Sequence, residues 1–96
     1  MKVYIAGKIN GDPKYKDKFL CAEYGLDKQL GHTVLNPADL PEGMAPADYM
    51  RICFAMMDSA DAVAFLPDYT DSKGAMLEHA WCEYVGKKII YLERPE

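Results

Sequence analysis

A polar stretch from Asp68 to Glu78 holds the residue types in this chain that are best suited to chemistry. It follows a continuously apolar run, Ala62 to Leu66, which Pro67 ends and which is typical of a strand buried on both faces. Ser72 is suited to cap a helix, and apolar residues then recur at helical spacing from Ala75 to Gly86. The stretch is therefore expected to form the loop and first helical turns after a buried strand.

Glu78 is expected about one turn inside this helix, near its positive end. The helix dipole would hold a carboxylate ionised there, and an ionised carboxylate that faces the loop could act as a nucleophile. The alternative is an ordinary solvated residue, because glutamate is a strong helix former. On the helix surface it would contribute only roughly a few tenths of a kcal/mol to stability.

The elements that must position this stretch form one predicted domain, residues 1–96. Strands are expected near 2–6, 32–35, 61–66 and 88–92, and helices near 13–30, 48–59 and 73–85. Four strands alternating with three helices predict right-handed crossovers and a parallel sheet, in a small doubly wound α/β domain of the Rossmann or flavodoxin type. We assume the strand order 2-1-3-4, in which the loops after strands 1 and 3 open side by side and form a ligand crevice.

The crevice would bring Gly7 to Asp12 next to the polar stretch, with Asn36 on its border. The segment Gly7 to Gly11 is a short glycine-bounded loop before a helix, where backbone N–H groups can bind an anion. It matches neither GxGxxG nor GxxxxGK[ST], and turn geometry alone is an equal explanation for its glycines. The proline-containing segment from Ala38 to Pro46 is expected to be an extended loop or lid.

Charge and composition exclude several classes of protein. The net charge of −4 argues against binding to a nucleic-acid polymer, and Lys14, Lys16 and Lys18 are expected on a solvated helix face, with phosphate binding as the alternative. The three cysteines are far apart and form no CxxC motif, so we expect core residues in a reduced compartment, with no metal site and no cofactor. No signal segment or membrane-length apolar run is present, which predicts a cytoplasmic protein without a membrane partner.

The small size of the chain also predicts association between copies, because a single core of this size is marginal alone. The last four residues, 93–96, are expected to fray unless a partner subunit holds them.

Several segments in order resemble a known superfamily: Tyr4 to Gly7, Gly31 to Pro37, Asp58 to Pro67, and Ser72 to Ala75 with Glu78. The set spans nearly the whole chain and is similar to the nucleoside 2-deoxyribosyltransferase-like superfamily, most closely to its small DUF4406 branch. The resemblance implies a glutamate nucleophile, matching Glu78, that attacks the anomeric carbon of a nucleoside sugar. A covalent glycosyl-enzyme would then pass to another base, as in the transferases, or to water, as in the related nucleotide hydrolases.

The same resemblance implies roles for four further residues. Asp71 would hydrogen-bond the leaving base or relay its proton, and Tyr4 would lie under the sugar or orient Glu78. Ser72 and Gly74 would supply hydroxyl and backbone donors to a sugar hydroxyl or 5′-phosphate. The structural alternatives are loop solvation for Asp71, a core aromatic for Tyr4 and a helix cap alone for Ser72.

Two positions depart from the superfamily's pattern. The transferases have a second base-contacting aspartate that falls here at or near Cys53, so the usual base recognition is not expected. The first loop also lacks the arginine of the nucleotide hydrolases, and Lys8 could substitute only as a point charge.

The leading interpretation is an enzyme that cleaves or transfers the N-glycosidic bond of a nucleoside or nucleotide. A non-catalytic binding module for such ligands and a plain interaction domain are the alternatives. The expected catalytic residues are Glu78, Asp71 and Tyr4, and the expected substrate-binding residues are Gly7, Lys8, Asn36, Ser72 and Gly74.

Overall fold

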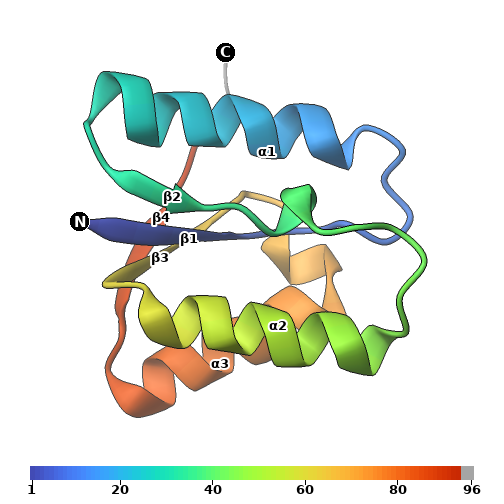
Figure 1. Cartoon of the computed structure of the whole chain (residues 1–96). Coiled ribbons are helices and arrows are strands. Elements are labelled where there is room, and N and C mark those ends of the chain that lie inside the picture. Colours follow the sequence, from blue (N-terminus) through green and yellow to red (C-terminus); the bar gives the residue numbers. More distant parts are fainter. Residues whose placement is uncertain (94–96) are drawn as a thin grey trace.

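A computed structural model describes residues 1–93 of the chain as a three-layer α/β fold (Figure 1). The sheet is entirely parallel, with the strand order β2-β1-β3-β4. Its strands are β1 (Lys2–Ala6), β2 (Thr33–Leu35), β3 (Ala62–Phe65) and β4 (Lys88–Tyr91). The predicted fold class and strand order are confirmed. The prediction that residues 93–96 fray concerns mostly residues outside the described part.

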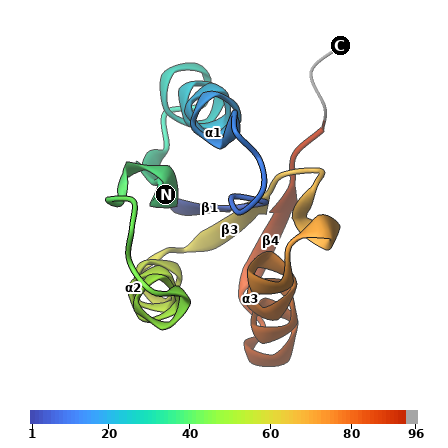
Figure 2. The ribbon, with the colours of Figure 1, turned by 90° about the vertical axis from the view of Figure 1, so that its right-hand side faces the viewer.

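Helices cover both faces of the sheet. The helices are α1 (Tyr15–Tyr24), which continues into a π-helical turn, η1 (Gly25–Gln29), then α2 (Pro46–Ser59) and α3 (Lys73–Val85). Two 3₁₀ turns, η2 (Pro37–Asp39) and η3 (Tyr69–Asp71), follow β2 and β3. Figures 1 and 2 show α1 on one face of the sheet and the pair α2 and α3 on the other. Within residues 1–93, no helix is both long enough and apolar enough to cross a bilayer.

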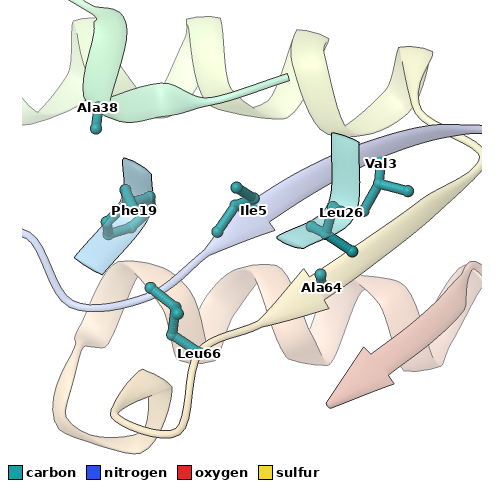
Figure 3. Close-up of a cluster of buried hydrophobic side chains, with 7 residues drawn as sticks. All are labelled: Val3, Ile5, Phe19, Leu26, Ala38, Ala64 and Leu66. Carbon is teal, nitrogen blue, oxygen red and sulfur yellow. The ribbon is translucent and has the colours of Figure 1, made fainter. Parts of the chain in front are cut away.

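Side chains along β1 alternate between the two cores. Val3 and Ile5 point toward α1 and pack with Phe19 and Leu26 (Figure 3). Tyr4 belongs to the opposite cluster, beneath α2 and α3. Because successive side chains of a strand face opposite ways, a central strand so fully buried needs apolar residues throughout. This alternation turns Tyr4 toward α3 and away from α1.

Two predicted helix starts were wrong by two residues each. The first helix begins at Tyr15, because Asp12 Oδ1 accepts a hydrogen bond from the Lys14 N–H (2.9 Å) in a turn that precedes the helix. The second helix, α2, begins at Pro46, since proline at the first helical position lacks only an N–H that would be unpaired anyway. The expected lid is therefore shorter than predicted.

Other expectations about burial were also wrong. Cys21 is exposed, although we expected it in the core with Cys53 and Cys82, which are half-buried and buried. The apolar residues of α3 do not all face inward: Met76 and Tyr84 lie on its outer side and are exposed.

Candidate functional site

A buried tyrosine–glutamate pair lies between the sheet and α3. The Tyr4 hydroxyl donates a hydrogen bond to Glu78 Oε2 at 2.6 Å, and the two residues are 1% and 6% exposed. Glu78 shares the inner side of α3 with Ala75 and Cys82, which are three and four residues away and equally buried. The strand and the helix thus aim the two polar groups at each other through a largely apolar layer.

Burial controls the protonation of this pair. Desolvation raises the pKa of Glu78 to about 7, and the hydrogen bond from Tyr4 offsets part of that rise. The helix dipole does not keep the carboxyl group at its ordinary pKa, and a solvated Glu78 on the helix surface is likewise ruled out by its burial. Burial, followed by the charge of Glu78, raises the pKa of Tyr4 well above its usual value, so its hydroxyl remains a donor.

The pair forms the floor of an open cleft of about 910 Å³, large enough for a small molecule with two ring systems. The loop between β1 and α1 forms one wall, and the loop before α2 forms the other. The first turns of α3 close one end with Ser72, Lys73 and Gly74. The cleft therefore lies at the carboxyl ends of β1 and β3. From β1 the chain continues to β2 on one side of the sheet, and from β3 it continues to β4 on the other side, and ligands commonly bind at such a point.

The lining of the cleft divides into an apolar and a polar part. The apolar part is rich in aromatic and sulfur-containing side chains: Tyr15, Met44, Tyr49, Met50 and Cys53. The polar part comprises Asn10, Asp12, Glu42, Ser72, Lys73 and Glu78. Such a cleft suits a ligand with one flat apolar portion and one hydroxylated portion.

Tyr49 holds the loop that forms the apolar wall. Its hydroxyl donates to the Pro41 carbonyl oxygen at 2.6 Å and accepts from the Met44 N–H at 3.3 Å. Sequence reasoning did not find this residue, because we assigned it only to the apolar side of α2. The proline and glycine content of the adjoining loop was the signal that a tether was required.

A lysine ties the loop after β1 to the loop after β3. Lys18 Nζ lies 2.5 Å from Asp12 Oδ2 and also pairs with Asp68. Asp12 and Asp68 in turn accept hydrogen bonds from the Lys14 and Lys8 N–H groups, at 2.9 Å and 3.1 Å. The hydrogen bond from Lys18, then that from the Lys14 backbone, lowers the pKa of Asp12. Lys18 was expected on a solvated face, but it is only 24% exposed.

Replacing Lys18 with methionine is expected to loosen the wall formed by residues 7–12. The change keeps the alkyl chain but leaves two neighbouring carboxylates without their shared cation. Amide hydrogen exchange at Lys8 and Lys14 should then accelerate by about fivefold. Lys28→Met, on an exposed part of η1, is the matched control. Unchanged exchange at both amides in Lys18→Met would contradict a bridging role.

Three of the residues predicted for substrate binding line the cleft: Gly7, Ser72 and Gly74. Ser72 Oγ accepts a hydrogen bond from the Ala75 N–H at 3.2 Å, so it caps α3 as well as facing the cleft. A Cβ atom on Gly7 would lie 2.6 Å from a Leu66 side-chain carbon, so close packing against β3 requires this glycine.

The structure places the other predicted residues outside the cleft lining. Asn36 is buried, where Nδ2 donates to Glu23 Oε1 (3.0 Å) and Oδ1 accepts from the Ala38 N–H (2.9 Å), so it caps η2. Asp71 is exposed at the end of η3, one residue before the cleft-lining Ser72. Lys8 is half-buried in the loop after β1. Within residues 1–93, no group of three or more acidic, histidine or cysteine side chains is arranged to hold a metal ion.

Fold and site together define a small doubly wound α/β domain with a ligand-sized cleft over a buried carboxyl group. The sequence model of a family described as Domain of unknown function (DUF4406) matches residues 1–91, and the chain belongs to that family. No curated protein is similar enough to the chain to count as a match.

Proposed function

We propose that the protein cleaves or transfers the N-glycosidic bond of a nucleoside or nucleotide, with Glu78 as the nucleophile. The observation that carries the proposal is the Tyr4–Glu78 pair on the floor of a cleft that both apolar side chains and polar groups line. A nucleobase fits the wall that holds Tyr49, and a sugar fits the polar part beside Ser72. The resemblance to the nucleoside 2-deoxyribosyltransferase-like superfamily supports the same assignment.

The reaction follows from the two oxygens of the Glu78 carboxylate. Tyr4 binds Oε2, which leaves Oε1 to form a bond to the anomeric carbon as the bond from that carbon to the base nitrogen breaks. The base leaves with the electron pair and takes up a proton. Water or a second base then attacks the same carbon and releases the carboxylate. Asp71, exposed one residue before the cleft-lining Ser72, is our candidate to contact the base or relay its proton.

A carboxylate in this position also stabilises the reaction before it forms a bond. Positive charge develops on the sugar ring of an oxocarbenium-like transition state, and a nearby anion lowers its energy most where water is excluded. Glu78 is buried enough for this effect, and the Tyr4 hydroxyl fixes the direction of its carboxylate. Tyr4 therefore acts as a positioning residue for the nucleophile.

Tyr4→Phe is expected to lower kcat by about 10- to 100-fold and to raise the pKa of Glu78, because the carboxylate loses its hydrogen-bond donor. The rising limb of the pH–rate profile should move to higher pH. Tyr15→Phe removes a hydroxyl from another tyrosine of the cleft and serves as the control. A Tyr4→Phe enzyme with a normal rate and a normal pH profile would contradict a positioning role.

Chromatography of the protein incubated with nucleosides and their 5′-monophosphates tests the proposal. Each compound is supplied with and without a second free base. Release of free base identifies water as the acceptor, and formation of a new nucleoside identifies base exchange. If a compound raises the melting temperature but no product forms from any of them, the protein is a binding module for these compounds and the proposed reaction is wrong.

A further inference from the structure

The outer side of α3 is an apolar surface with no partner in the described part of the chain. Met76, Leu77 and Tyr84 are 50%, 59% and 92% exposed, and the small residue Ala80 lies among them. These positions share one side of the helix because residues three, four and seven apart do so. Figure 2 shows α3 at the edge of the molecule, with the sheet above it and α2 on one side.

We propose that a second copy of this chain covers this surface, with the two α3 helices antiparallel about a twofold axis. Charge complementarity favours this occupant. Lys73 and Glu83 lie on the same outer side. Position 78 is the midpoint between Lys73 and Glu83, and also the midpoint between Met76 and Ala80. Antiparallel pairing about residue 78 places Lys73 of each copy opposite Glu83 of the other, so the surface is complementary to itself.

The apolar contacts agree with the same register. Met76 of one copy lies opposite Ala80 of the other, and a small residue at the crossing lets two helix axes approach to about 8–10 Å. An aromatic side chain as exposed as Tyr84 contributes about 150–250 Å². With the methionine and leucine, and with the flanking Lys73, Ala80 and Glu83, the two copies together bury roughly 1,000 Å², about the size that a biological interface should exceed.

This pairing would also complete the cleft. Ser72 and Tyr84 are each six residues from residue 78, so Tyr84 of the second copy comes to lie beside Ser72. Ser72, Lys73 and Leu77 all line the cleft at this end. The second copy therefore adds an aromatic ring to the end of each cleft that the first turns of α3 line.

Sedimentation equilibrium over a range of protein concentrations tests the interface. The unaltered chain is expected to form dimers, and Tyr84→Glu is expected to weaken association at least tenfold without changing the circular dichroism spectrum, because the side chain is exposed. Leu20→Glu, at an exposed apolar position on α1, should associate normally. A chain that is monomeric at every concentration, or a dimer that Leu20→Glu disrupts and Tyr84→Glu does not, would overturn the proposal.

Exchange of the two charges tests the antiparallel register. Lys73→Glu and Glu83→Lys should each weaken the dimer several-fold, and the double variant should restore it. Both single changes suit the helix dipole, because they place an anion near the N-terminus and a cation near the C-terminus. Glu83→Lys also removes the 3.3 Å contact between Glu83 and His79, so its circular dichroism spectrum is compared with that of the unaltered chain. Lost association therefore cannot be attributed to unfolding of α3. Failure of the double variant to recover would overturn the register.

Discussion

Glu78→Gln is expected to reduce release of free base at least about 1,000-fold, because the amide cannot form the bond to the anomeric carbon. Glutamine keeps the size of the side chain and can still accept the hydrogen bond that Tyr4 donates at 2.6 Å. Alanine would leave that hydroxyl unpaired in a buried layer and would mix a stability effect with the chemical one. The glutamine variant should therefore fold, bind the substrate and fail to turn it over.

The rate of the proposed reaction should also depend on pH in the unaltered protein. Only the ionised carboxylate attacks, and burial raises the pKa of Glu78 to about 7. Below that pH, kcat/KM should fall about tenfold for each unit of pH, and above it the rate should level off. Asp17→Asn makes the same carboxylate-to-amide change at an exposed position on α1 and should retain both rate and profile. Normal turnover in Glu78→Gln would exclude Glu78 as the nucleophile.

The same substitution should make the protein more stable at alkaline pH. The folded-state pKa of Glu78 is about 7, against an ordinary value of 4.5, so the folded chain binds this proton more tightly than the unfolded chain. The resulting stability is fully present below pH 4.5 and is lost as the pH rises to 7, by about 3 kcal/mol. Above pH 7, the folded unaltered protein contains a buried negative charge at Glu78, and the glutamine variant has no charge at this position.

Denaturant unfolding from pH 4 to pH 8 measures this difference. Glu78→Gln should be about as stable as the unaltered chain at pH 4 and about 3 kcal/mol more stable at pH 8, or roughly 10 °C or more higher in Tm for a chain of this length. The pKa shifts of Asp12 and Asp61 have the opposite sign and affect both proteins alike, so they cancel. Equal stability of the two proteins at pH 8 would contradict the burial of an ionisable Glu78. The expectation that Glu78 has little effect on stability assumed a position on the helix surface, and the burial of Glu78 contradicts that assumption.

The fold could be predicted from the sequence because its signals are local and repeated. The apolar run at β3 indicated a strand buried on both faces, residues 2–6 indicated a further strand, and Ser72 and Gly86 marked the two ends of α3. The alternation of strands and helices along the chain is compatible with only a few arrangements of the strands in a sheet. The ends of α1 and α2 were less predictable, because Pro13 and Pro46 are each compatible with a turn or with the first position of a helix.

The arrangement of the site depended on contacts far apart in the sequence. The sequence pointed to Glu78 and Tyr4, but the two residues are 74 positions apart, so no local pattern indicated that they are in contact. The pKa of Glu78 is raised because the side chain is buried, and that burial is seen only in the structure. Asn36 carries the signal of a loop residue after a strand, yet it caps its own turn because asparagine binds backbone N–H groups two residues on. The bridge from Lys18 to Asp68 spans 50 positions, and no local pattern in the sequence marks it.

A trapped glycosyl-enzyme would test the proposed nucleophile most directly. Substrate analogues with fluorine at the 2′ position of the sugar slow the loss of the intermediate, because fluorine destabilises the oxocarbenium-like transition state. Mass spectrometry of the intact protein should then show the addition of one sugar residue, and peptide mapping should place it on Glu78. No addition should occur in Glu78→Gln. A sugar found on any other residue, or turnover of the analogue's parent nucleoside without any covalent adduct, would contradict nucleophilic catalysis by Glu78.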